Sequence, residues 1–385
     1  MTLYEQRKFV APEFIFGLNA RQRVAQYARN FGARRVLLVS DAGIAAERWL
    51  NDVRVTLDAA GLASEVFLDV TPNPRDREVR AGTEFYRSCG CDVIVAVGGG
   101  SVIDCAKGIG IMATNGGDIL TYEGIDKIEA PTPPLICIPT TAGTSADLSQ
   151  FCIITDLGRR VKIAIISKAA VPDVALVDPE TTLTMDPYLT ACTGIDALVH
   201  AMEAFVSTAS SPVVDVHALA AMRLIRDNLV ATIKAPGDLV RREQMMLASL
   251  QAGLAFSNAS LGAVHATAHS LGGFLDRPHG ESNALMLEHV IRFNYSNAAD
   301  RYDTIAQTLG IDLRGMTGTQ RRDALVEWVR QLRLACGVCD GLGARGVRSG
   351  DIDDLSGFAA QDPCIFTNPR RANRDDLHVI YEEAL

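Results

Sequence analysis

The sequence lacks the features of several protein classes. No apolar run reaches the roughly 18 to 20 residues that a membrane-spanning helix needs. The first residues, MTLYEQRKFVAPEF, have no apolar stretch after a basic start, so we expect no secretory leader. Basic residues are in deficit, with a net charge of −9 over 385 residues, which argues against a nucleic-acid-binding face. These absences favour a cytoplasmic protein that works without a membrane or a nucleic acid.

The cysteine patterns of disulfide-rich and zinc-ribbon proteins are also missing. The nine cysteines are scattered and odd in number, which does not make a disulfide framework. Cys336 and Cys339 form a CxxC pair, but no second pair follows at the spacing of a structural zinc site. We therefore expect ordinary reduced thiols.

The chain is long enough for two domains, and its hydrophobic pattern changes once. From residue 33 onward, short β-branched runs alternate with helical patterns, which predicts parallel βαβ units with helices on both faces of the sheet. Beyond residue 187, apolar residues recur only at helical spacing. The sequence thus predicts an α/β domain with a parallel sheet over residues 1–185 and an all-α domain over residues 186–385.

A glycine turn follows the most apolar predicted strand. In VIVAVGGGSVIDCAKGIG, the residues Gly98, Gly99, Gly100 and Ser101 separate this strand from a helix. Glycines let the backbone approach a ligand closely, and the helix N-terminus attracts an anion such as a pyrophosphate. The alternative is a tight turn without a ligand, and the ordinary GxGxxG fingerprint is absent.

Two further polar groups lie where neighbouring strands are expected to end. The loop PTTAGTS, residues 139–145, carries hydroxyls that can bond a ribose or a phosphate, or else cap a helix. Asp41 can accept hydrogen bonds from ribose hydroxyls and repel a 2′-phosphate, which favours NAD over NADP; its alternative role is a helix cap. Because parallel strands end at one crevice, these groups point to one dinucleotide site.

Five side chains of the second half form a candidate metal site. Asp196 and His200 are four residues apart on a predicted helix and share a face, and His265 and His269 repeat that spacing. His279 follows after a glycine-containing stretch that is expected to turn the chain back. A catalytic metal needs an open position for its substrate, so one of the five is expected not to bind it. Spacing alone does not identify which one.

The motifs GGGSVIDCAK, PTTAGT, TGIDALVHAMEAFVS and HATAHSLGGFLDRPHGESNA, in this order, resemble the iron-dependent (group III) alcohol dehydrogenase family over nearly the whole chain. The resemblance implies a dinucleotide-binding α/β domain and a helical metal domain, an architecture like that of dehydroquinate synthase, with the active site in the interdomain cleft. It implies reversible hydride transfer between NAD and a small primary alcohol or aldehyde. Fe²⁺ is the implied metal, with Zn²⁺ as an alternative, and a homo-oligomer is expected.

The resemblance also implies roles for single residues. The implied metal ligands are Asp196, His200, His265 and His279, and His269 is the implied catalytic residue that relays the proton. The implied cofactor residues are Asp41, Gly98, Gly99, Gly100, Ser101, Asp104, Lys107, Thr140, Thr141, Thr144 and Lys162. Relatives often read TAGTGSE where this chain reads TAGTSAD through Asp147, a departure that concerns contacts around the nicotinamide end of the cofactor.

Other functions fit the same motifs. A lyase like dehydroquinate synthase, or a polyol- or hydroxy-acid-phosphate dehydrogenase, needs basic groups for an anionic substrate, and Arg277 inside the histidine segment keeps that alternative open. A non-catalytic metal-binding protein would take up metal without saturable NAD binding, and both cofactor loops argue against it.

Overall fold

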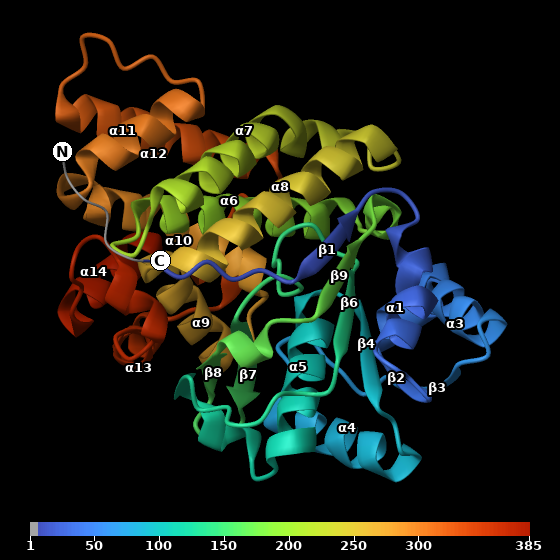
Figure 1. The fold of residues 1–385 in the computed structure, drawn as a ribbon. Coiled ribbons are helices and arrows are strands. Elements are labelled where there is room, and N and C mark those ends of the chain that lie inside the picture. The colour runs from blue at the N-terminus through green and yellow to red at the C-terminus, as the bar shows by residue number, and fades with distance from the viewer. Residues whose placement is uncertain (1–6) are drawn as a thin grey trace.

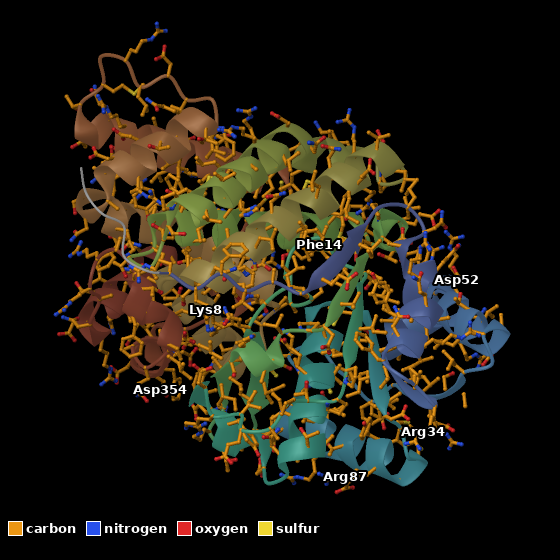
Figure 2. The ribbon with its side chains drawn as sticks, in the orientation of Figure 1. Lys8, Phe14, Arg34, Asp52, Arg87 and Asp354 are labelled. Carbon is orange, nitrogen blue, oxygen red and sulfur yellow. The ribbon has the colours of Figure 1, made fainter. Side chains whose placement is uncertain are left out.

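A computed structural model of the chain describes residues 7–385. Residues 1–6, part of the stretch in which no leader is expected, lie outside the described residues. A parallel sheet with its helices occupies the first half of the chain, and helices alone follow, gathered in one body beside the sheet (Figure 1). Charged side chains such as Lys8, Arg34, Asp52 and Arg87 lie on the outside (Figure 2).

The main sheet has six parallel strands among the described residues. Their order across the sheet is β1 (Glu13–Phe16), β9 (Val174–Val177), β6 (Leu135–Pro139), β4 (Val93–Gly98), β2 (Arg35–Val39) and β3 (Ala63–Phe67). The predicted α/β fold with a parallel sheet is therefore confirmed. All six carboxyl ends lie at one edge, where the glycine turn and the threonine loop begin.

Helices cover both faces of this sheet, as the nearly continuous apolar strands predict. On β2, Val36 and Leu38 pack with α1 (Val24–Asn30) and α3 (Arg48–Ala59). Leu37 and Val39 point the other way and pack with α4 (Asp76–Cys89) and α5 (Gly100–Asn115). The alternation follows from the two-residue period of a strand.

A small second sheet was not expected from the sequence. It contains β5 (Gly124–Ile125), β8 (Val161–Ile166) and β7 (Phe151–Asp156), and the β7–β8 hairpin is antiparallel. The run FCIITDLGRRVKIAII does show two β-branched segments around a Gly-containing turn, which is a hairpin pattern. This hairpin carries Lys162 and Phe151 to the site.

The second half is helical, as predicted. Its helices are α6 (Pro187–Val206), α7 (Pro212–Lys234), α8 (Leu239–Ala259), α9 (Ala263–Leu275), α10 (His279–Asn294), α11 (Ala299–Thr308), α12 (Gly318–Ala335), α13 (Ile352–Ala359) and α14 (Arg374–Ala384). An acidic or hydroxyl side chain caps the first three: Asp186, Ser211 and Asp238 each accept a first-turn N–H. Helix α6 is long and apolar enough to cross a membrane, but 94% of its most apolar 18-residue window is buried inside the protein, as befits a central core helix.

Candidate metal and cofactor site

The glycine turn lies between β4 and α5, where close packing requires glycine. A Cβ atom at Gly98 would come 2.6 Å from the Val102 side chain, and one at Gly100 would come 2.8 Å from Oγ1 of Thr144. No side chain caps the N-terminus of α5, so its first N–H groups are free for a ligand. Ser101, in the first turn, lines the cavity described below. The turn and the helix dipole together suit an anionic group.

The threonine loop packs directly against this turn. A Cβ atom at Gly99 would come 3.2 Å from Cγ2 of Thr141, and Thr144 lines the cavity. The hydroxyls of Thr140 and Thr141 are buried and have no hydrogen-bond partner among the described residues. Because a buried unpaired hydroxyl is costly, these two groups fit a polar ligand such as a dinucleotide.

Three charged residues near the turn have different surroundings. Asp104 lines the cavity, and burial raises its pKa to about 6 although Lys107 opposes the shift. Lys162 also lines the cavity, and burial lowers its pKa to about 8. Lys107 does not line the cavity. Its Nζ donates to the carbonyl groups of Ser149 at 2.9 Å and Phe151 at 2.6 Å. Lys107 thus fixes the chain that follows the threonine loop.

Asp41 lies two residues after the end of β2, the strand next to β4 in the sheet. Its Oδ1 accepts the N–H of Ile44 at 2.9 Å and caps the short helix α2 (Ala42–Ala46), which is the alternative role considered above. The other carboxylate oxygen remains available to a ligand at this edge, so capping and ribose recognition are compatible.

Four side chains from three helices converge in the helical half. Asp196 and His200 lie on α6, His265 on α9, and His279 is the first residue of α10. One candidate ligand atom from each lies within 4.8 Å of all the others. Nε2 of His265 is 3.8 Å and Nε2 of His279 is 3.7 Å from Oδ1 of Asp196. The set has the size and the donors of a metal site.

The chemistry of these donors suits a divalent cation. Burial lowers the pKa of His200, and it lowers those of His265 and His279 well below 6.5, so the imidazoles are neutral and offer lone pairs. Oδ2 of Asp196, Nδ1 of His200 and Nδ1 of His279 are buried without a hydrogen-bond partner among the described residues. A carboxylate with three neutral imidazoles fits both Fe²⁺ and Zn²⁺.

Two residues that the sequence interpretation missed support these donors. Oε2 of Glu203 lies 2.7 Å from Nδ1 of His265, and Oε1 accepts the N–H of Val264 at 2.7 Å. Burial raises the pKa of Glu203 to about 7, while the N–H groups of Val264 and its neighbours oppose the rise. Glu203 lies seven residues after Asp196 on the same face of α6, so the helical period could have indicated it.

Asn283 is the second missed residue, one turn after His279 on α10. Its Nδ2 donates to Oδ1 of Asp196 at 2.5 Å and lies 3.2 Å from Nε2 of both His265 and His279. This amide therefore contacts three of the four candidate ligands.

His269 is separate from the four-residue cluster but faces the same space. Its ring centre lies 5.3 Å from that of His279 and 5.9 Å from that of His265, and it lines the cavity. Its Nδ1 lies 2.8 Å from Oδ2 of Asp362. Burial opposes the ionisation of Asp362, but the charge and hydrogen bond of His269 help to hold the pKa of Asp362 below its usual value. The carboxylate favours the tautomer with hydrogen on Nδ1, which leaves Nε2 of the neutral ring free to accept a proton.

The expected turn before His279 is shorter than predicted. The glycine-containing stretch was expected to bend, but α9 continues through Leu275, and only 276–278 form the turn. Gly272 and Gly273 are helical because β8 approaches them: a Cβ at Gly273 would come 2.7 Å from the backbone N of Lys162. These glycines permit close packing rather than a bend.

A cavity of about 100 Å³ joins the cofactor turn to the metal cluster. Gly100 and Ser101 bound one side, and His200, His265, His269 and His279 bound the other. The rest of the lining includes apolar Pro74, Ala146, Phe151, Ile153, Phe256 and Leu261 and polar Asn73, Asp104, Thr144, Ser149 and Lys162. No arginine of residues 7–385 lines the cavity, and the guanidinium of Arg277 packs against Gly346 instead. The space suits a small uncharged molecule.

Two family models match the chain. One described as iron-containing alcohol dehydrogenase matches residues 11–179, and one described as the C-terminal part of the Fe-containing alcohol dehydrogenase family matches residues 190–385. The 1,3-propanediol dehydrogenase of Citrobacter freundii is 38% identical over 384 residues, which cover 99% of each chain. The NAD-dependent methanol dehydrogenase of Bacillus methanolicus is 35% identical, covering 98% of this chain and 99% of its own. The crystal structure of a 1,3-propanediol oxidoreductase is similar with a TM-score of 0.95 at 37% identity, covering 99% of this chain and 100% of that one.

Proposed function

Because this chain belongs to the iron-containing alcohol dehydrogenase family, we propose that it transfers a hydride reversibly between NAD and a small primary alcohol or its aldehyde. Family membership makes it an oxidoreductase of alcohols and aldehydes that depends on NAD and a divalent metal. The observation that carries the more specific proposal is that one cavity joins the glycine turn and the histidine cluster.

We assign the metal to Asp196, His200, His265 and His279, and we propose Fe²⁺, with Zn²⁺ as the alternative. A divalent cation held there would supply Lewis acidity to the oxygen of the alcohol or aldehyde. Glu203 and Asn283 orient the donors through the hydrogen bonds described above.

The dinucleotide is assigned to the edge where the strands end. Gly98, Gly99, Gly100 and Ser101, with the N-terminus of α5, accommodate the pyrophosphate. Asp41 excludes a 2′-phosphate at the adenosine end. The remaining polar contacts come from Asp104, Thr140, Thr141, Thr144 and Lys162.

His269 is the residue we assign to the proton. With Nδ1 held by Asp362, its Nε2 takes up the proton that leaves the alcohol and returns it in the reverse direction. Because hydride transfer oxidises the alcohol carbon by two electrons and reduces the nicotinamide by two, one proton must leave, and His269 provides its path.

The cavity favours a short, uncharged substrate. Apolar side chains such as Phe151, Ile153 and Phe256 line it, and among the described residues its ionisable lining consists of Asp104, Lys162 and the histidines. A phosphorylated or carboxylated substrate would lack an arginine partner there, so neither a dehydroquinate-synthase-like lyase nor a polyol-phosphate dehydrogenase is favoured. The 1,3-propanediol and methanol dehydrogenases that resemble the chain are named for short uncharged alcohols.

We further propose two domains, 1–185 and 186–385, that meet at the site. The gap between the two matched family models, which end at 179 and begin at 190, supports this division. We propose a homo-oligomer, since the edge strand β1 exposes apolar groups such as Phe14, which is 38% exposed (Figure 2). A cytoplasmic location agrees with nine free thiols in the part of the chain that the structure describes.

The test is to reconstitute one metal-free preparation anaerobically with Fe²⁺ or with Zn²⁺. NAD and NADP are then compared with primary alcohols, diols, hydroxy acids and polyol phosphates as substrates. We expect net NADH production from short primary alcohols or diols, dependent on added metal. Turnover of phosphorylated substrates alone, or consumption of substrate without net NADH, would overturn the proposal.

A further inference from the structure

Ser145 holds a backbone conformation that residues with side chains seldom adopt. Its φ of 49° lies in the left-handed region, which favours glycine. The residue is 2% exposed, so its side chain is enclosed by protein. It is the first of three positions, 145 to 147, at which TAGTSAD differs from the TAGTGSE that relatives often show. Contacts of the Ser145 side chain must therefore offset the energetic cost of this backbone conformation.

Those contacts reach across to the helical half. Oγ of Ser145 donates to the carbonyl oxygen of Ser249 on α8 at 2.7 Å, across 104 residues of sequence. The same oxygen lies 3.0 Å from Oγ of Ser249 and 3.3 Å from the carbonyl oxygen of Gly143. A buried hydroxyl with these partners is fully satisfied and ties the threonine loop to α8.

Helix α8 is shaped to receive this side chain. Gly253 lies one turn after Ser249, and a Cβ atom there would come 2.5 Å from Cβ of Ser145 and 2.9 Å from Cδ1 of Leu148. One further turn along, the carbonyl oxygen of Ser257 accepts a hydrogen bond from Nε2 of Gln150 at 2.6 Å. The same face of α8 thus holds the chain at Ser145 and again at Gln150.

The other side of the loop faces the cofactor turn and α6. Thr144, next to Ser145, packs against Gly100 at the start of α5. A Cβ atom at Gly143 would come 2.4 Å from the carbonyl oxygen of Thr193 on α6. Ala142 and Leu148 belong to the hydrophobic core of the helical half rather than to the core of the sheet. The loop is clamped between the two halves of the molecule.

We propose that Ser145 is a positioning residue for the dinucleotide. Its hydrogen bond to α8 fixes the threonine loop at the place where Thr140, Thr141 and Thr144 meet the cofactor. Ser145 does not line the cavity itself, although its neighbours Thr144 and Ala146 do, so it acts through them. This inference rests on the proposed NAD-dependent function. It assigns to Ser145 the role of holding the threonine loop in place, without contacting the cofactor itself.

The first test separates the hydroxyl from the backbone conformation. Ser145→Ala removes the hydrogen bond and keeps the unfavourable φ, so KM for NAD and the dissociation constant of NADH should rise roughly five- to tenfold. Ser145→Gly also removes the hydrogen bond but tolerates the φ, so its effect should be smaller. In both variants kcat should change less than twofold, and metal content and KM for the alcohol should stay as in the unaltered protein.

Ser356→Ala is the matched control. This serine is also fully buried, and its Oγ donates to the carbonyl oxygen of Asp353 at 3.0 Å, within the segment that forms α13. Its loss should leave the KM for NAD unchanged. If Ser145→Ala bound NADH as tightly as Ser356→Ala, or lost metal and kcat while KM for NAD stayed constant, the positioning role would be wrong.

A compensating pair provides the second test. Gly253→Ala should displace the Ser145 side chain, raise KM for NAD and lower the melting temperature. In the Ser145→Gly background the Cβ contact is absent, so Gly253→Ala should cause a clearly smaller loss in both measurements. Equal losses in the two backgrounds would overturn the proposed contact. The melting temperature can be measured without enzyme turnover, so it tests the contact between Ser145 and Gly253 independently of activity. If the unaltered protein reduced no NAD, that result would refute the proposed function and leave the test of the contact intact.

Discussion

Nδ1 of His265 lies 2.7 Å from Oε2 of Glu203, and both side chains are almost completely buried. The other carboxylate oxygen accepts the N–H of Val264, at the start of the helix that carries His265. Glu203 therefore fixes both the ring orientation and its tautomer, which leaves Nε2 directed at Asp196. One carboxylate of α6 thus orders a donor on α9.

Replacing Glu203 with glutamine should weaken metal binding. The carboxylate of Glu203 faces two donors, the N–H of Val264 and Nδ1–H of His265. A glutamine would turn its own NH₂ donor toward one of them, so His265 would lose its fixed orientation. Metal affinity should then fall roughly 10- to 100-fold. Metal content per subunit, measured after dialysis against graded chelator, checks this. Glu84→Gln, at an exposed position of α4, is the control and should keep the metal. Equal retention by both variants would contradict the orienting role.

The two histidines one turn apart on α9 should behave differently. His265→Ala removes a proposed donor and should strip metal and activity together. His269→Ala should keep most of the metal but lower kcat about 100-fold or more, because the proposed general acid–base group is lost. Metal analysis and steady-state kinetics on the same preparations decide between them. If His269→Ala lost its metal, the assignment of the two residues would have to be exchanged.

Asp362→Asn should lower kcat without releasing metal. Asp362 holds Nδ1 of His269 at 2.8 Å and does not belong to the four-residue cluster. Without the carboxylate charge, the imidazolium form of His269 loses its partner, and kcat should fall about tenfold or more. Asp354→Asn, on the outer surface of α13 (Figure 2), is the control. An Asp362→Asn variant with unchanged kcat would show that His269 works without this partner.

Much of the fold and the central candidate residues could be predicted because their patterns are local. Apolar strands alternating with helices indicate a parallel sheet, and Asp196 with His200 share a helix face by spacing alone. Glu203 continues the same face, so the helical period could have indicated the residue but not the side chain that it contacts. Its partner His265 lies 62 residues away, and this distance is closed only by the packing of α9 on α6.

Long-range pairing explains the other omissions. Asp362 lies 93 residues from His269, and Ser145 lies 104 residues from Ser249, so neither pair leaves a pattern in one stretch of sequence. Because glycine destabilises a helix when its neighbours in space are not known, the pattern at Gly272 and Gly273 predicts a turn. They are helical because β8 packs too closely for any side chain there. Only the tertiary structure distinguishes these two uses of glycine.

Asp41 offers a test of cofactor choice in which stability and charge can be separated. Asp41→Ser keeps an N-cap acceptor for Ile44 but removes the negative charge. We expect kcat/KM with NADP to rise relative to NAD, while the melting temperature stays nearly constant. Asp41→Ala removes both functions and should also lose about 1 kcal/mol of stability. If Asp41→Ser left the NADP to NAD ratio unchanged, Asp41 would be only a helix cap.

Lys162 should take up a proton when NAD binds at alkaline pH. Burial lowers the pKa of Lys162 from its usual 10.5 to about 8, so the free protein carries a neutral amine above that pH. Phosphate charge and hydrogen bonding to the cofactor favour the ammonium form, which raises the pKa on binding. At a pH between these two pKa values, binding therefore consumes a proton, and NAD affinity should fall as the pH rises through about 8.

Calorimetry at about pH 9 in two buffers of different ionisation enthalpy measures this proton uptake, which should vanish at about pH 6. Lys162→Met should abolish it, and Lys168→Met, at an exposed neighbouring site, should not. Equal uptake by all three proteins would exclude Lys162 from the cofactor site.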